Sequence, residues 1–363
     1  RGYLGYAINS GLMSMGHVLN QPFQAYSVLQ AVASHKEGGK ILNKHWARFL
    51  VQDLSRYVRT NHVDDNIGAS SAEVLGSYQG CGVGEHYWTQ YRVGFQGIYI
   101  LPYFAASHRL VGDQALKRDP LYLGDNGEWV FGRVESGYVT FRYKALQVFG
   151  GRMARNWGIL NETSLIFSNN PYSYDHYGFE LATNRFGLSY YTTRLDDVNG
   201  INVQAALPKY EVSKRYLAVQ RFNFNFSPRL QLAMTEAAIY GGPGQTMASV
   251  FLNPMNLYYI AQRNNRVQMS GLWSLDLFYK PLRALTFYGQ WLIDDIIVNN
   301  EPGQNDRQRH PDRMGVSVKV VGTDLITAAD QLSFYYTRIG NWTYMSYRTW
   351  ENYLFESKSL GYP

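Results

Sequence analysis

Residue types that could catalyse a reaction are present in this chain, but their spacing fits none of the common catalytic motifs. The eight histidines are scattered, and the sequence contains neither a G-x-S-x-G elbow nor an H-E-x-x-H helix. His86 and His108 are expected on neighbouring strands, where they could face one another. Asp294 and Asp295 are adjacent, and because adjacent strand residues point to opposite faces we expect a strand-to-loop boundary there and not an acid–base pair. We therefore predict no enzyme, no metal site and no cofactor.

Basic residues are the second group with possible chemistry. The net charge is +6, and many arginines and lysines fall in loops or on the predicted inward side of strands. A positive lumen or rim attracts acidic polymers, phosphates or carboxylated sugars. The alternative is that lumen charges pair with one another and make a filled barrel rigid. Nucleic acid is not an expected partner, because no nucleic-acid-binding fold accompanies the charge. These basic residues are Arg92, Arg133, Arg142, Lys144, Arg152, Arg155, Arg215, Arg221, Lys319 and Arg338.

Aromatic residues are the third group. The chain has 30 tyrosines and is 15% aromatic. Loops rich in Tyr, Trp and Asn are typical of sugar-binding surfaces, where aromatic faces stack on pyranose rings. For tyrosines near strand ends, the alternative is a membrane girdle. Arg152, Arg155 and Trp157 cluster where a strand meets a long loop, and packing inside the lumen would explain them equally well. The candidate glycan-binding or lumen residues are Arg152, Arg155, Trp157, Tyr172, Tyr174, Tyr177, Tyr258, Tyr259 and Trp342.

The elements that position these residues are predicted to be strands. From about residue 68 the hydrophobic period is two, as expected when one strand face meets lipid and the other meets the lumen. Residues 87–103 predict one strand that is long enough to cross a bilayer when it is tilted. One face carries Tyr87, Tyr91, Val93, Phe95, Tyr99, Leu101 and Tyr103, and the other carries Gln90, Arg92 and Gln96.

Three hairpins repeat this alternation. The first has Phe222, Phe224 and Phe226 on one face and turns at Ser227-Pro228-Arg229, the second turns at residues 280–283, and the third turns after Gly322. Longer polar stretches near 158–177, 196–213, 241–264 and 296–312 separate them. We count about fourteen candidate strands. Short turns on one side and long loops on the other are the sidedness of an outer-membrane barrel, whose long loops face outward.

The N-terminal part of the chain is predicted to differ. Apolar residues of segments 25–32 and 42–57 recur at helical spacing, and Gly38-Gly39 separates them. We therefore predict an N-terminal helical plug over residues 1–66 and a transmembrane β-barrel over 67–363. Helices that pack outside the lumen are the alternative to a plug. No stretch approaches the ~20 consecutive apolar residues that a membrane helix needs, and the single cysteine, Cys81, is assigned no role.

Several segments, taken in order, resemble the Wzi family of capsule-assembly outer-membrane proteins. Residues 148–158 are similar to the family's G-R-x-x-x-x-W-G stretch. The resemblance covers roughly 300 residues, and each motif alone is weak. The remaining segments are Gly11-Leu12-Met13, Gln21-Pro22-Phe23, Arg215-Tyr216-Leu217, Thr235-Glu236, Ile239-Tyr240-Gly241, Leu252-Asn253-Pro254, Phe287-Tyr288-Gly289-Gln290 and Ile293-Asp294-Asp295.

The resemblance implies an all-β, antiparallel barrel in the bacterial outer membrane with an N-terminal helical bundle at its periplasmic end. It further implies a lectin-like role in attaching capsular polysaccharide without catalysis. We expect 16–18 strands when the barrel is complete, with the closing strands beyond Pro363. The expected partners are acidic surface polysaccharide, outer-membrane lipid and other surface proteins. A transport channel, a barrel subunit of a larger surface complex and a soluble β-sandwich or propeller are the alternatives.

Overall fold

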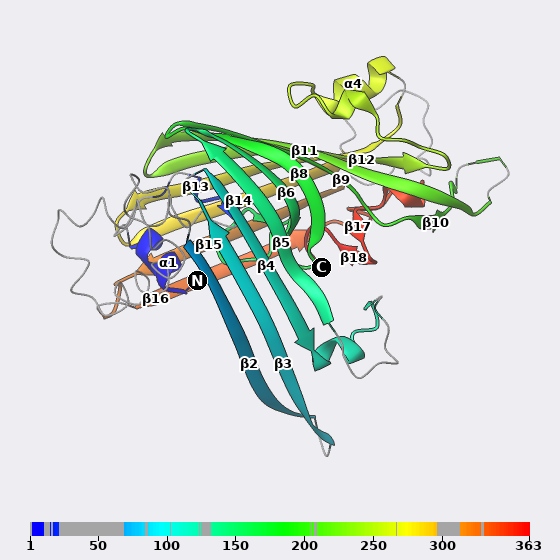
Figure 1. Cartoon of the computed structure of the whole chain (residues 1–363). Coiled ribbons are helices and arrows are strands. Elements are labelled where there is room, and N and C mark those ends of the chain that lie inside the picture. The colour runs from blue at the N-terminus through cyan, green and yellow to red at the C-terminus, as the bar shows by residue number, and fades with distance from the viewer. Residues whose placement is uncertain are drawn as a thin grey trace.

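The structure is a computed structural model that describes residues 2–10, 15, 17–21, 69–83, 86–101, 103–122, 124, 132–203, 205–206, 209–265, 267–295, 313–327 and 330–363. Its main element is a 14-stranded antiparallel sheet that curls around an interior (Figure 1). Strands adjacent in the path follow chain order from β2 at one edge to β16 at the other, and β10 pairs with β11 beside this path. The prediction of about fourteen strands in an all-β, antiparallel sheet is confirmed.

Most strands of this sheet are long. The first half comprises β2 (Ala69–Val83), β3 (His86–Ile100), β4 (Phe104–Asp113), β5 (Gly132–Tyr143), β6 (Leu146–Met153), β8 (Tyr174–Ala182) and β9 (Phe186–Arg194). The second half comprises β10 (Val198–Gly200), β11 (Glu211–Ser227), β12 (Leu230–Gly242), β13 (Ser270–Leu282), β14 (Leu285–Asp295), β15 (Arg313–Thr323) and β16 (Gln331–Ile339).

Most connections between the strands alternate in length as predicted, and the two-residue connection between β2 and β3 is an exception. At one end, turns of two or three residues join β5 to β6, β8 to β9, β11 to β12 and β13 to β14. At the other end, the longer connections carry short helices: η2 (Gln114–Arg118), η3 (Ser249–Phe251) and α4 (Tyr258–Asn265). The predicted loop at 296–312 lies outside the described residues. We call these the short-turn end and the long-loop end.

The residue alternation follows the predicted faces. In β11, Phe224 and Phe226 are exposed on the outward face, while Arg221 and Asn223 are buried on the inward face. Two boundaries differ from prediction. Strand β3 ends at Ile100, so that Tyr103 lies in the turn to β4. Strand β13 continues through Pro281, because a register shift between Tyr279 and Leu282 accommodates a residue without an N–H donor.

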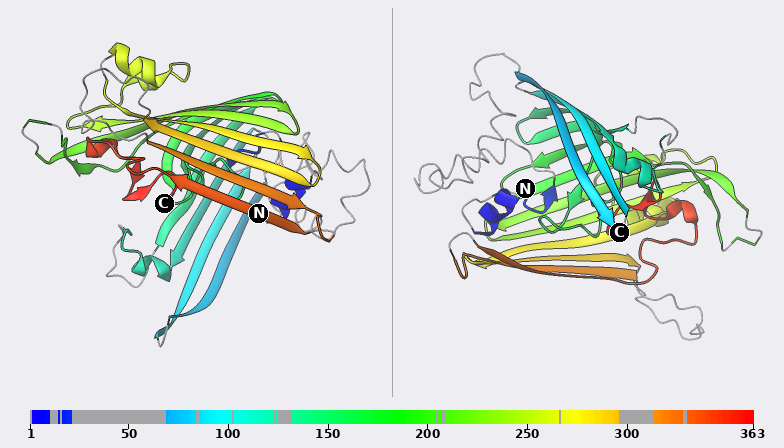
Figure 2. Two further views of the ribbon diagram at one scale, coloured as in Figure 1. Left: turned by 180° about the vertical axis from the view of Figure 1, so that it is seen from behind. Right: turned by 90° about the horizontal axis from the view of Figure 1, so that it is seen from below.

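Two small sheets lie apart from the large one. β1 (Asn20–Gln21) pairs with β7 (Asn156–Trp157), and β17 (Leu354–Phe355) pairs with β18 (Lys358–Ser359). Both views of Figure 2 place the N- and C-terminal segments within the curve of the sheet. These segments therefore belong to the interior of the barrel.

Among the described residues, the N-terminal segment, connection 158–173 and the C-terminal segment pack the interior. Helix α1 (Gly2–Asn9) lies at the short-turn end, where Ala7 and Ile8 pack with Phe278 and Tyr288 of the wall. The Lys280 ammonium donates to the Ile8 carbonyl at 3.2 Å. Connection 158–173 and the C-terminal segment 340–363 form a second cluster, whose buried members include Phe167, Tyr353 and Leu360.

The predicted helices at 25–32 and 42–57, and with them most of the plug assigned to residues 1–66, lie outside the described residues. Of that domain, the structure describes α1 and residues 15 and 17–21, which are held inside the sheet. None of the helices in the described residues has the length and hydropathy to cross a membrane.

Candidate functional site

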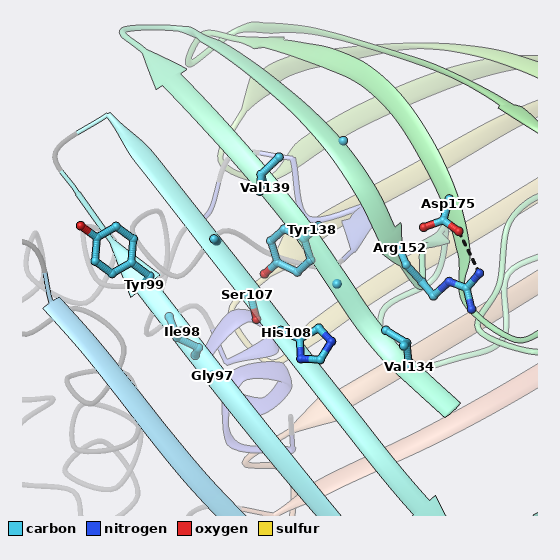
Figure 3. Close-up of a pocket in the computed structure, with 13 residues that line it drawn as sticks. Gly97, Ile98, Tyr99, Ser107, His108, Val134, Tyr138, Val139, Arg152 and Asp175 are labelled. Atoms are coloured by element: carbon cyan, nitrogen blue, oxygen red, sulfur yellow. Dashed lines mark hydrogen bonds and ion pairs between the residues drawn. The ribbon is translucent and has the colours of Figure 1, made fainter. Parts of the chain in front are cut away.

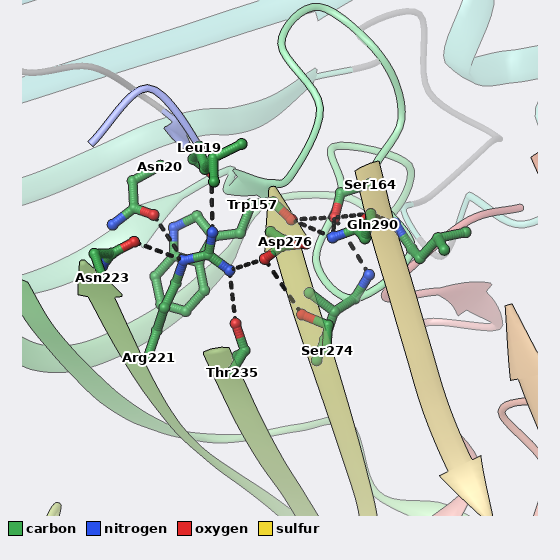
Figure 4. Close-up of polar contacts among 12 residues, drawn as sticks. Leu19, Asn20, Trp157, Ser164, Arg221, Asn223, Thr235, Ser274, Asp276 and Gln290 are labelled. Carbon is green, nitrogen blue, oxygen red and sulfur yellow. Dashed lines mark hydrogen bonds and ion pairs between the residues drawn. The ribbon is translucent and has the colours of Figure 1, made fainter. Parts of the chain in front are cut away.

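The interior is built around a buried arginine on β11. Arg221 is fully buried and forms an ion pair with Asp276 of β13. Its guanidinium also donates to Thr235 Oγ1 at 2.6 Å and to Asn20 Oδ1 at 2.7 Å (Figure 4). Because β11, β12 and β13 are adjacent, their inward side chains converge on one cation. Through Asn20, this network fixes the N-terminal segment inside the barrel.

A second buried arginine, Arg155, lies in the 148–158 stretch that resembles the family's G-R-x-x-x-x-W-G motif. Arg155 donates from Nε to His176 Nε2 at 2.8 Å and from Nη1 to Glu180 Oε1 at 3.0 Å. Trp157 lies between the two networks, because the guanidinium carbons of Arg155 and Arg221 are each 5.4 Å from its ring centroid. Such contacts stabilise a desolvated cation. Arg155 and Trp157 therefore act in packing, the alternative considered from the sequence.

The end of this motif requires a glycine. Gly158 has φ of +155°, and a Cβ added there would lie 2.6 Å from Nε2 of Gln290. The Gln290 amide instead donates to the Trp157 carbonyl at 2.9 Å and accepts from the Leu165 N–H at 2.6 Å. Connection 158–173 is thereby attached to the inward face of β14 (Figure 4).

Arg152 differs from the expectation that it faces the lumen. It pairs with its register partner Asp175 at 2.8 Å on the outward face, the face on which Val148 of the same strand and Tyr177 of β8 are exposed. Figure 3 shows Arg152 and Asp175 at one end of a shallow hollow in this wall, with Tyr99 toward the other end. Tyr177 on the same face matches the membrane-girdle alternative.

The remaining predicted residues are dispersed. Tyr174 is buried in the interior against Phe355, at a centroid distance of 5.3 Å. Tyr258 and Tyr259 begin α4, and Trp342 is exposed in the segment after β16. The nine candidates therefore do not form one site. His86 and His108 lie on the neighbouring strands β3 and β4 but do not face one another, because His86 pairs with Val83 and His108 with Gly97.

Tyr172 is the candidate that lies in a polar cluster at the long-loop end. Its hydroxyl donates to Asp119, which follows η2, and the Lys358 ammonium contacts the same carboxylate at 2.6 Å. The Arg133 guanidinium lies 4.3 Å and the Lys358 ammonium 4.0 Å from the Tyr172 ring centroid. We call these residues, with Tyr122, the rim cluster: Asp119, Tyr122, Arg133, Tyr172 and Lys358.

Local structure positions these side chains precisely. Lys358 begins β18 directly after a turn in which Glu356 and Ser357 have φ of +46° and +63°. Two positive φ values match the twist of a tight hairpin, although side chains other than glycine make them costly. Asp119 accepts the Leu121 N–H at 2.9 Å, which fixes its orientation after η2.

The electrostatics of the rim cluster keep its charges. Partial burial acts to raise the pKa of Asp119, but hydrogen bonds from Lys358 and Tyr172 lower it to about 2. The pKa of the Tyr172 hydroxyl is raised, by burial and then by Asp119. The Lys358 and Arg133 side chains remain 18% and 28% exposed. The cluster is therefore a preorganised, partly accessible pair of cations on an aromatic ring.

This cluster brings together residues that sequence reasoning mostly missed. Arg133 and Tyr172 were candidates, whereas Asp119, Tyr122 and Lys358 were not. The residues 117–120, Lys-Arg-Asp-Pro, mark a charged turn after β4, but nothing local relates them to Lys358. Because the Tyr172 ring carries two cations, its role is to hold them and not to offer an open stacking face. No group of described residues has the His, Cys, Asp and Glu clustering that could hold a metal ion.

Comparison with known proteins gives a family and a fold. The family model described as "Capsule assembly protein Wzi" matches residues 42–320. A solved structure of Wzi from Escherichia coli, described as an outer membrane protein involved in group 1 capsule assembly and a carbohydrate-binding β-barrel, superposes with a TM-score of 0.62 at 14% identity. The alignment covers 99% of this chain and 76% of that one.

Other solved structures match less well. OmpT of Vibrio cholerae has a TM-score of 0.34 at 9% identity, over 77% of this chain and 90% of its own. OprD of Pseudomonas aeruginosa has a TM-score of 0.29 at 12% identity, over 74% and 71%. Neither likeness carries an argument. A search of curated protein sequences finds no match.

Proposed function

Because the chain belongs to the Wzi family of capsule assembly proteins, we propose that this outer-membrane barrel holds an acidic surface polysaccharide at the rim cluster. The observation that carries the proposal is the pair of cations, Arg133 and Lys358, that Tyr172 and Asp119 hold at the long-loop end. The long loops of outer-membrane barrels face the cell exterior. The rim cluster therefore lies where a polymer outside the cell can reach it.

The chemistry of the cluster suits a carboxylated or phosphorylated sugar. A guanidinium can bind a carboxylate through two parallel N–H bonds, and an ammonium adds a point charge. Asp119 remains available as an acceptor for sugar hydroxyls while it anchors Lys358. Binding and not turnover is proposed, since the cluster pairs cations with one carboxylate and lacks a nucleophile–base pair of the kind that hydrolases use.

The test is retention of the acidic polysaccharide extracted from the source cell surface on detergent-purified, full-length protein. We expect saturable retention that weakens with salt, because exposed charges are screened. Arg133→Gln combined with Lys358→Gln should lower affinity by at least about tenfold, which corresponds to roughly 1.4 kcal/mol. Lys209→Gln, which removes an exposed cation paired with Glu211 elsewhere in the long-loop end, is the matched control and should leave retention unchanged.

Three outcomes would contradict the proposal. One is no retention by a protein whose barrel is verified as folded. Another is equal loss in the rim variant and in Lys209→Gln, because only the total positive charge would then matter. Retention of a neutral polymer with the same affinity would likewise exclude recognition through Arg133 and Lys358.

A further inference from the structure

The connection between β12 and β13 packs against the outside of the barrel wall. Phe251 and Tyr258 of this connection are fully buried against Tyr216, Ala238 and Tyr240 of β11 and β12. Tyr216 and Tyr240 are register partners on the outward face, opposite to inward Arg215. Figure 1 shows α4 on the outer side of these two strands. We call residues 247–263 the wall segment.

Polar side chains in the wall fix the wall segment in place. Gln220 and Glu236 are cross-strand partners on the outward face, yet each is only 1% exposed. Glu236 accepts the N–H groups of Tyr258 and Tyr259 at 3.0 Å, and so caps the start of α4. Gln220 Nε2 donates to Glu236 at 2.6 Å and to the Asn256 carbonyl at 2.7 Å. Without the wall segment, both polar groups would face the surroundings of the barrel.

The attachment point lies within the lipid-facing height of the wall. Large apolar residues begin to be exposed at the short turn itself, where Phe226 is 64% exposed. Each residue of a strand tilted by about 40° advances roughly 2.5 Å across a membrane. The distance from Leu230 to Glu236 is then about 15 Å, inside an apolar band about 25 Å tall. The wall segment therefore meets the barrel in the outer half of that band.

The side of the wall segment that faces away from the barrel is mostly apolar, and its exposed polar residues are Ser249, Asn253 and Arg263. In water, its exposed apolar side chains would form a hydrophobic patch that nothing covers. Arg263 contacts one of them, with its guanidinium 4.9 Å from the Tyr259 ring centroid and a hydrogen bond to that hydroxyl at 2.7 Å. The exposed apolar residues are Met247, Leu252, Met255, Leu257, Tyr259 and Ile260.

We propose that the wall segment is embedded in the outer leaflet of the membrane, where its apolar side chains contact lipid acyl chains. The patch continues the lipid-facing wall, which exposes Leu232 and Leu275 on the neighbouring part of β12 and β13. Arg263 has a long side chain that can direct its charge toward lipid phosphates while its stem stays in apolar surroundings. The proposal rests on the outer-membrane location and not on polysaccharide binding, so that either can fail separately.

The test places a fluorescent label on the wall segment of full-length protein. In a Cys81→Ser background, Met255→Cys and Ile260→Cys are each labelled and the protein is reconstituted into vesicles of lipid A and phosphatidylethanolamine. Leu275→Cys reports the lipid-facing wall, and Val203→Cys, exposed in a loop at the long-loop end, reports water. We expect labels at 255 and 260 to lose emission with bromine-labelled acyl chains and to resist iodide, as at 275.

Two results would overturn the proposal. Quenching by iodide and not by brominated chains, as expected at position 203, would place the wall segment in water. Protection from both quenchers, together with a dimer in chemical crosslinking, would show that a second copy of the chain covers the patch. Glycan retention is measured on the same labelled protein as a separate test of the proposed function. Its result does not change whether the quenching data place the wall segment in lipid or in water.

Discussion

At the scale of single residues, buried charges inside the barrel are paired with one another. Arg221 and Asp276 are both fully removed from solvent and pair with each other, and Arg221 also donates to the hydroxyl of Thr235. Removing one partner leaves an uncompensated buried charge, whereas removing both does not. From the sequence, paired lumen charges are the alternative to a binding surface, and Arg155 and Arg221 each form such an ion pair.

Arg221→Met is expected to lower the free energy of unfolding by about 3–5 kcal/mol, because Asp276 is then buried alone. The double substitution Arg221→Met with Asp276→Leu should cost less than either single change. Chemical denaturation in detergent micelles measures both. Arg194→Gln breaks an exposed pair with Asp197 and should change stability by less than about 1 kcal/mol. Equal effects of Arg221→Met and Arg194→Gln would contradict a structural role for the buried pair.

Asp119 gives the rim cluster a pH dependence at the acid end. Its folded-state pKa is lowered from 3.8 to about 2. A depressed carboxyl pKa contributes stability that is present above the ordinary value and is lost as pH falls through the folded-state value. Between those two values, the carboxyl binds a proton in the unfolded state but stays largely ionised in the folded state, so the stabilisation from its contacts with Lys358 and Tyr172 declines as the pH falls.

Pepsin is active throughout this range and can therefore report the change. We expect cleavage within β17 and β18 to increase as the pH falls from about 4 toward 2 in the natural protein. In Asp119→Asn, cleavage of β17 and β18 should already be fast at about pH 4, and its rate should change little as the pH falls. A natural protein whose cleavage pattern is flat over the same range would show that Asp119 does not hold the hairpin.

At the scale of elements, α4 depends on a residue outside its own sequence. Glu236→Ala removes the acceptor of the Tyr258 and Tyr259 N–H groups and leaves buried donors unsatisfied, at about 1–3 kcal/mol. Hydrogen exchange of the wall segment should accelerate while exchange in β11–β14 stays slow. Glu236→Gln keeps an acceptor and should accelerate exchange less. If exchange in the wall segment is the same in both variants and in the natural protein, Glu236 does not fix α4.

The elements also show what the sequence could predict. The alternation of Phe222, Phe224 and Phe226 predicts the faces of β11 because strand geometry is local. Glu236 on an outward face breaks this rule, and its reason lies in a loop that folds back on the wall. The contact between Asp119 and Lys358 joins residues far apart in sequence, and periodicity contains no information about such pairs. The rim cluster was therefore beyond sequence reasoning, although Tyr172 and Arg133 were candidates.

At the scale of the whole molecule, the packed interior argues against a conducting channel. Helix α1, connection 158–173 and segment 340–363 occupy the inside of the sheet, and they contribute to two apolar clusters there. We expect full-length protein in a planar bilayer to show no steady ion conductance. A porin measured in the same membrane is the positive control. Stable, ion-selective steps from the pure protein would favour the channel alternative over polysaccharide attachment.

A protein that anchors a polymer must also withstand the force that acts on that polymer. A polymer bound at Lys358, as proposed, would transmit any pull into the C-terminal segment, whose carbonyls at Trp350, Asn352 and Leu354 all accept bonds from the guanidinium of Arg215. Arg215 belongs to β11, a strand paired along its length on both sides. Tension would thus be spread as shear over two ladders, and resistance to it is set by the rate of unfolding and not by equilibrium stability.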